Sequence, residues 1–155
     1  MKSSNKEHGK KNIPQVKTFT VPFNLEEIKY NISISTDIPA KLSKDQIINQ
    51  ALNFHSKGNI SEASKYYQYF INQGFKDYKV FSNYGNILKD LGKSKEAEIF
   101  TRKTIEINPD FALSHYNLGN ILRDLGNLEE AELSTRKAIE LNPDFTTAHL
   151  NLGSI

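Results

Sequence analysis

The sequence repeats itself with a period of 34 residues. The stretch from Asn83 to Phe111 returns from Asn117 to Phe145, and 20 of the 29 compared positions are identical. A fixed period of this length is typical of stacked supersecondary units, each too small to bury its own apolar face. Such stacks usually present a groove to a partner, so the repeat favours binding over catalysis.

Small residues show that the repeat extends beyond the identical stretch. They recur every 34 residues, at Gly58, Gly92 and Gly126 and at Ala63, Ala97 and Ala131. Glycine ends a helix at little cost because it adopts positive φ readily. The spacing predicts an array over residues 43–155, with units at 44–77, 78–111 and 112–145 and a partial unit at 146–155.

Local signals predict two helices in each unit. Ser43 is placed to cap a helix from Lys44 to about Ser56, and Asn59 with Glu62 forms a capping-box pattern for a second helix, to about Asn72. In the later units the prolines that follow the second helix stop it, and we expect the next residues to accept N–H groups of the following helix. These pairs are Pro109 with Asp110 and Pro143 with Asp144. Three small residues allow the helices of a unit to approach closely, namely Gly85, Gly119 and Ala131.

Composition fits one modest domain with a basic N-terminal segment. The chain has 155 residues, of which 37% are hydrophobic, and it has no apolar run long enough to span a membrane. The basic start is not followed by an apolar stretch, which argues against a secretory signal. The absence of cysteine excludes disulfides and thiolate metal sites. We therefore expect a cytoplasmic protein without membrane contact.

Residues 1–42 form the predicted N-terminal segment, basic and mostly disordered or extended. Residues 1–43 hold seven lysines and four acidic residues, whereas residues 44–155 are nearly balanced in charge. No aromatic residues or arginines lie among the first lysines, so we expect no nucleic-acid partner. Residues 16–40 contain two short stretches that alternate in polarity, around 18–23 and 32–38, which is compatible with a small hairpin or with an extended course over the first helices.

The repeated residues resemble the tetratricopeptide repeat, a helix-turn-helix unit of 34 residues. Counted from Ala112, the unit at 112–145 matches the family pattern at His115, Leu118, Gly119, Leu122, Gly126, Ala131, Ala138 and Pro143. Two departures stand out. Position 24, often aromatic in the family, holds Thr101 and Thr135, and the first unit has Phe75 in place of the closing proline. The resemblance implies an all-α, right-handed superhelical solenoid of antiparallel helix pairs, with about three repeats plus one extra helix.

The first helix of each unit has two faces, since residues advance by about 100° each. Positions 4, 7, 8 and 11 share the core face, on which we place His115 and the equivalent His149. In the tetratricopeptide family the opposite face lines the concave surface of the superhelix. From it we select these candidate peptide-binding residues: Asn49, Asn83, Asn86, Lys89, Tyr116, Asn117, Asn120, Arg123 and Asn151.

Position 6 of every unit is an asparagine, at Asn49, Asn83, Asn117 and Asn151. A carboxamide both donates and accepts, so it can bind the backbone of an extended peptide without reading side chains. The series resembles the asparagine ladder of the eukaryotic transferase that attaches N-acetylglucosamine to protein serines and threonines. The alternative is a polar residue on a solvated face, inherited by repeat duplication. Chaperone-tail recognition in this family requires a lysine at position 5, and no unit has one.

No pattern of residues predicts catalysis, a metal site or a cofactor. His115 and His149 occupy equivalent positions in successive units, roughly 15–20 Å apart for helices spaced by 8–10 Å, which is too far for one metal ion. We expect both histidines to be packed in the core. No Ser/His/Asp arrangement and no phosphate-binding glycine loop is present.

The partial unit ends after a first helix with an apolar face. Repeat arrays normally end in a unit with a polar outer face, so we expect this chain to be part of a longer array or a larger protein, or to self-associate through this helix. The predicted function is a non-catalytic module that binds a peptide or protein segment on the concave face. The alternative is a recruiting region of a larger enzyme, of the glycosyltransferase or sulfotransferase type that often follows such arrays.

Overall fold

The computed structural model describes residue 38 and residues 41–155, which form seven α-helices and no strand. The predicted N-terminal segment and the alternating stretch at 16–40 lie almost entirely outside the described residues. The helices are α1 (Lys44–Ser56), α2 (Ile60–Asn72), α3 (Tyr78–Asp90), α4 (Ser94–Ile107), α5 (Ala112–Asp124), α6 (Leu128–Leu141) and α7 (Thr146–Leu152). Among them, no helix is long and apolar enough to cross a membrane.

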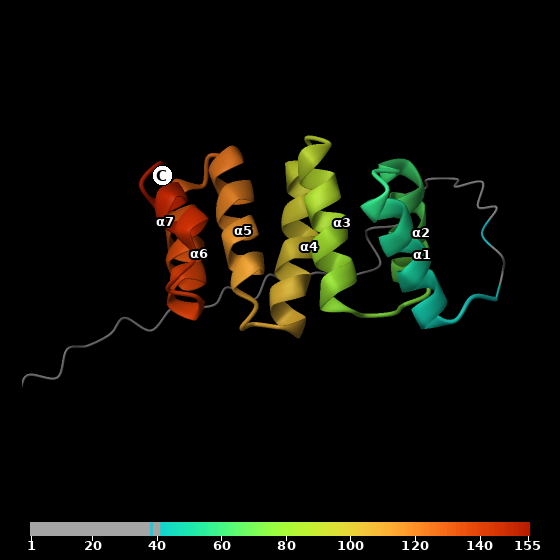
Figure 1. Ribbon diagram of the computed structural model, residues 1–155. Coiled ribbons are helices and arrows are strands. Elements are labelled where there is room, and N and C mark those ends of the chain that lie inside the picture. Colours follow the sequence, from blue (N-terminus) through green and yellow to red (C-terminus); the bar gives the residue numbers. More distant parts are fainter. Residues whose placement is uncertain (1–37, 39–40) are drawn as a thin grey trace, which may run out of the picture. The chain divides into compact units, whose positions relative to one another are not determined.

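Consecutive helices pair and the pairs stack in chain order (Figure 1). α1 packs on α2, α3 on α4 and α5 on α6, while α4 against α5 and α6 against α7 join one pair to the next. First helices of successive units also meet, since α3 contacts α5. This is the all-α solenoid of antiparallel helix pairs that the sequence predicts.

Capping follows the sequence at the first two helices and departs from it later. Ser43 accepts from the backbone N–H of Gln46, whose side chain in turn accepts from the N–H of Ser43. Asn59 accepts from the N–H of Glu62. The expected caps at Asp110 and Asp144 are wrong, because the N-cap positions of α5 and α7 fall one residue later, on phenylalanines that cannot accept a hydrogen bond.

The predicted roles of the glycines are confirmed. Gly92 and Gly126 follow their helices with φ of 74° and 81°, a conformation that L side chains rarely adopt. Gly119 sits where α5 meets α6, because a Cβ there would lie 2.3 Å from Oγ1 of Thr135. The threonine at position 24 thus packs on the glycine of the partner helix, which accounts for one departure from the family pattern.

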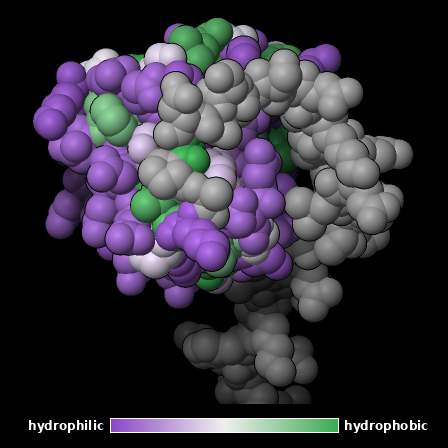
Figure 2. All heavy atoms as spheres, turned by 90° about the vertical axis from the view of Figure 1, so that its right-hand side faces the viewer, coloured by the Kyte–Doolittle hydropathy of each residue, from purple (hydrophilic) through white to green (hydrophobic). Residues whose placement is uncertain are grey.

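The core has two clusters of different character. The larger one includes Tyr67, Phe70 and Tyr84 of the first two units and extends to Ile121 of the third. The buried residues of the smaller one, all in the third unit, are Leu118, Leu122 and Ala131. The end of the array formed by α1 and α2 is largely hydrophilic where its coloured atoms are seen (Figure 2). A polar outer surface is what a terminal unit of a repeat array requires.

Candidate functional site

The candidate residues lie on one side of α1, α3, α5 and α7, and we call their side chains, at positions 5, 6, 9 and 12 of each unit, the asparagine face. Their burial increases toward the later helices. Asn49 is exposed, and Asn83, Asn86, Lys89, Tyr116 and Arg123 are half-buried. In contrast, Asn117, Asn120 and Asn151 are only 7–8% exposed. The later asparagines are therefore packed between helices rather than standing free in solvent.

Two of the position-6 asparagines in the first three units bond to the unit before them. Nδ2 of Asn117 donates to Oδ1 of Asn86 over 2.9 Å, which joins α5 to α3. Asn83 is hydrogen-bonded to the hydroxyl of Tyr67, which also lies 3.1 Å from Nδ1 of His55. Burial raises the pKa of Tyr67, and the bond from Asn83 opposes part of that rise. These asparagines thus help to join the stack.

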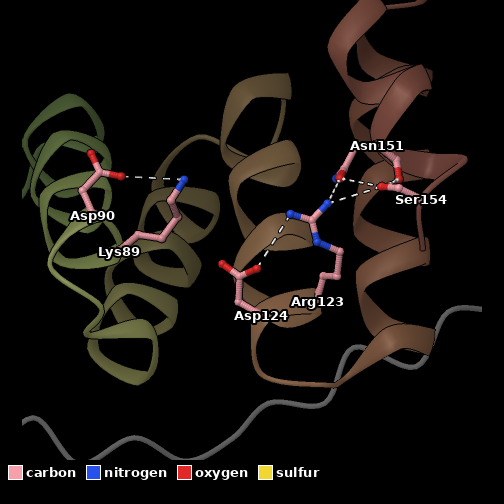
Figure 3. A network of polar contacts seen from close by, with 6 residues as sticks. All are labelled: Lys89, Asp90, Arg123, Asp124, Asn151 and Ser154. Carbon is pink, nitrogen blue, oxygen red and sulfur yellow. Dashed lines mark hydrogen bonds and ion pairs between the residues drawn. The ribbon is translucent and has the colours of Figure 1, made fainter.

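Arg123 holds a small polar network at the junction of α5 and α7 (Figure 3). Its guanidinium donates to Oδ1 of Asn151 and, over 3.4 Å, to Oγ of Ser154. It also faces the carboxylate of Asp124 at 3.7 Å. The equivalent residue one unit earlier, Lys89, pairs with its own neighbour Asp90 at 3.8 Å.

One donor in this network is left without a partner. Nδ2 of Asn151 is buried and makes no hydrogen bond with any residue that the structure describes. Buried polar groups are hydrogen-bonded in the large majority of cases, so each exception points to strain, to a missing water or to a missing ligand. Nδ2 of Asn151 is therefore a donor on the asparagine face that a ligand can pair.

A hollow of about 320 Å³ lies at the same junction. It is lined by Tyr116, Asn120, Arg123, Thr147, Leu150, Asn151 and Ser154. The carboxamides, the guanidinium and the hydroxyls offer both donors and acceptors, while Tyr116 and Leu150 add an apolar wall. Such a lining suits a ligand that carries polar main-chain groups together with an apolar side chain.

Four of the nine candidates line this hollow, and three lining residues were not among the candidates. The four are Tyr116, Asn120, Arg123 and Asn151, and the three are Thr147, Leu150 and Ser154. These three occupy positions 2, 5 and 9 of the partial unit, the first two on α7 and Ser154 just after it, so the 34-residue periodicity is sufficient to find them. The remaining candidates, on α1, α3 and α5, are not among the residues that line the hollow.

The expectation that both histidines pack in the core is wrong. His115 is half-buried and His149 is exposed, and Nε2 of each lies 2.8 Å from a proline carbonyl, Pro109 and Pro143 respectively. Each histidine thus meets the loop before its own helix instead of the core. No group of three or more His, Asp or Glu side chains suited to a metal ion occurs within the described part of the chain.

The chain matches known proteins over its regular units. Two family models described as tetratricopeptide repeat match residues 78–111 and 112–145. The comparison with curated proteins found no match.

Solved structures share the fold at low sequence identity. A crystal structure of MamA is similar with 17% identity and a TM-score of 0.69, over 72% of this chain and 66% of that one. An O-GlcNAc transferase of Thermobaculum terrenum has 24% identity and a TM-score of 0.64, over 70% of this chain and 21% of that one. The first tetratricopeptide domain of Spaghetti, bound to an HSP90 peptide, has 18% identity and a TM-score of 0.67, over 75% of this chain and 94% of that domain.

This chain thus spans less than two thirds of the length of MamA and about a fifth of the transferase. The similarity in these cases is one of fold. Taken with the matched repeats and the stacked helix pairs, it leads to one conclusion. The two regular units of this chain, at 78–111 and 112–145, are tetratricopeptide repeats.

Proposed function

We propose that this chain is a non-catalytic interaction module that binds an extended peptide, or an extended segment of a partner protein, along the asparagine face. The observation that carries the proposal is the hollow between α5 and α7, which lies on that face and is lined by donors, acceptors and two apolar side chains. Tetratricopeptide repeats bind peptides or proteins, as the similar domain of Spaghetti with its HSP90 peptide illustrates.

The spacing of the face suits an extended chain. Because α3 contacts α5 directly, first helices of successive units are spaced as packed helices are, by about 8–10 Å, and not by the roughly 15–20 Å expected from the sequence. An extended chain rises about 3.3 Å per residue. Each step from one first helix to the next therefore corresponds to about three residues of a bound peptide. A carboxamide can bond to the peptide main chain at each step. The asparagine face therefore recognises the main chain of the peptide more than its side chains.

The partner differs in chemistry from a chaperone tail. The side chains at position 5 are Ile48, Ser82, Tyr116 and Leu150, none of them basic. We propose a partner protein met in the cytoplasm, with neither nucleic acid nor a cofactor involved.

The test uses the two candidate asparagines whose side chains bond no other described residue, Asn49 and Asn120. Replacing both with alanine removes ligand contacts but leaves no partner in the described part of the chain unpaired. Peptides selected by display against the wild-type protein should bind the Asn49→Ala/Asn120→Ala variant about tenfold more weakly or worse, since each lost hydrogen bond contributes about 1 kcal/mol. Calorimetry measures the affinity, and Lys137→Ala on α6 serves as the control.

Unchanged affinity in the double alanine variant, with an unchanged circular dichroism spectrum, contradicts the proposal. An equal loss in Lys137→Ala also contradicts it, because Lys137 lies on a second helix and pairs with Glu140 of the same helix. A selection that yields no binding peptide contradicts the proposal as well.

A second candidate function is a partner-recruiting region attached to an enzyme of the glycosyltransferase or sulfotransferase type. The similarity to about a fifth of the Thermobaculum transferase favours it. Reading the gene beyond the codon for Ile155 tests this candidate, which requires a catalytic domain in the same frame. A stop codon directly after Ile155, with an endogenous protein of 17.6 kDa, rules it out.

A further inference from the structure

Two equivalent junctions on the asparagine face are bonded in different ways. The α3–α5 junction contains Asn86, Lys89 and Asn117, and the α5–α7 junction contains the residues 34 positions later, Asn120, Arg123 and Asn151. Four of the six residues are asparagines in matching places, so these two sets differ in sequence only by lysine against arginine.

At the α3–α5 junction the two carboxamides bond to each other. Nδ2 of Asn117 donates to Oδ1 of Asn86 over 2.9 Å, and Lys89 pairs with Asp90. The ammonium group of a lysine is a compact point charge, so one carboxylate suffices as its partner. This hydrogen bond competes with a ligand for Oδ1 of Asn86 and for one N–H of Asn117.

At the α5–α7 junction the corresponding bond between Asn151 and Asn120 is not formed. Arg123 donates to Oδ1 of Asn151 instead, since its fork of N–H groups reaches Asn151, Ser154 and Asp124 together. Nδ2 of Asn151 is consequently buried without a partner, and Asn120 bonds no other described residue. Both carboxamides line the hollow of about 320 Å³.

We propose that Arg123 is a specificity-determining residue that opens the α5–α7 junction as the main binding site for the backbone of an uncharged extended peptide. A carbonyl of the ligand accepts from Nδ2 of Asn151, and a neighbouring N–H of the ligand donates to Oδ1 of Asn120. The inference rests on the proposed function and names its site and ligand chemistry. Nδ2 has no exposed surface, so this binding mode requires the carboxamide of Asn151 to turn toward the hollow.

The surroundings favour a neutral ligand with an apolar side chain. Leu150 is 72% exposed beside the half-buried Tyr116, and these two side chains form the apolar wall of the hollow. The positive charge of Arg123 already faces Asp124, and residues 112–155 hold three Lys and Arg against six Asp and Glu. A carboxylate would meet this acidic excess, whereas a peptide carbonyl would not.

The test removes the arginine from the α5–α7 junction. Arg123→Lys should let Asn151 bond to Asn120 and should weaken the binding of an uncharged peptide, selected by display, at least fivefold. Arg136→Lys makes the same exchange on α6, outside the asparagine face, where Arg136 pairs with Glu132 of its own helix, and should retain the wild-type affinity. Calorimetry gives the affinities, and thermal melting shows that both conservative variants are folded.

Several outcomes overturn the inference. They are an Arg123→Lys variant with wild-type affinity, an Arg136→Lys variant that loses as much affinity as Arg123→Lys, and tighter binding of the peptide when one of its residues is replaced by Asp or Glu. The last result would make Arg123 a carboxylate site. If Asn49→Ala/Asn120→Ala weakens binding while Arg123→Lys does not, the proposed function stands and only this inference fails. If neither variant weakens binding, both fail.

Discussion

The first and third units fill the same positions with side chains of very different size. Position 24 is Tyr67 in the first unit and Thr135 in the third, and position 27 is Phe70 and Ala138. All four side chains are fully buried. The 34-residue period therefore sets where the helices begin and end. The size of the side chains packed between them differs from one unit to the next.

The two units reach a buried core by different routes. In the first, the rings of Phe70 and Phe75 lie 5.4 Å apart, so the residue that replaces the closing proline is part of the aromatic cluster. In the third, Thr135 satisfies its own hydroxyl by donating to the carbonyl of Ala131 over 2.9 Å and lies against Gly119. Contacts between aromatic rings stabilise the first unit, and the close approach of α5 and α6 stabilises the third.

The largest expected effect is in the aromatic unit. Phe70→Ala should lower the free energy of unfolding by about 3–5 kcal/mol, because it leaves a cavity in a fully buried cluster. Urea denaturation measures the change. Leu133→Ala, at a side chain that is 54% exposed, should change it by about 0.5 kcal/mol or less. Equal losses in the two variants would show that the aromatic cluster has no special weight.

The second-largest effect is expected from adding a side chain where α5 and α6 approach closely in the third unit. Gly119→Ala should cost about 1–3 kcal/mol, since its Cβ would lie 2.3 Å from Oγ1 of Thr135. The matched substitution Gly85→Ala meets Oγ1 of Thr101 at 3.1 Å, and the gain of about 1 kcal/mol in helix propensity offsets much of that contact. The same urea titrations compare them. A Gly85→Ala variant that loses as much as Gly119→Ala would contradict the proposed difference.

A smaller effect should appear at high pH through Tyr67. Burial raises its pKa in the folded state, so the unfolded chain loses the phenolic proton first and the protein loses stability as the pH rises above about 10. Tyr67→Phe removes this contribution. The fall in the denaturation midpoint between about pH 9 and pH 11 should therefore be shallower in the variant than in the wild type. If the midpoint fell equally steeply in both proteins, groups other than Tyr67 would be responsible for the loss of stability at high pH.

The smallest expected effect concerns the ion pairs between the second and third units. Arg102 pairs with Glu98 on its own helix at 2.9 Å and with Glu130 on α6 at 2.7 Å. Because these side chains are partly exposed, Arg102→Ala should cost less than about 1 kcal/mol, and the loss should shrink at high salt. Arg136→Ala, which removes a pair within α6 alone, provides the comparison. A loss that salt does not alter would point to packing instead.

The sequence predicts the helices better than it predicts the contacts between units. The bounds of α1 and α2 and the turn at Gly126 follow from caps and from positive φ, which are local properties. In contrast, the burial of Asn117 and Asn151 depends on contacts with the neighbouring unit. The periodicity of one helix alone does not predict such contacts. The exposure of His149 and the shifted cap after Asp144 have the same origin, since the turn into α7 sets both.

The central claim is that the asparagine face binds an extended peptide. Titration of the isotope-labelled protein with a selected peptide, followed by amide chemical shifts, tests it most directly. We expect the largest changes in chemical shift for amides of α3, α5 and α7, including the side-chain amides of Asn120 and Asn151. Shifts confined to the outward surfaces of α2, α4 and α6 would contradict it.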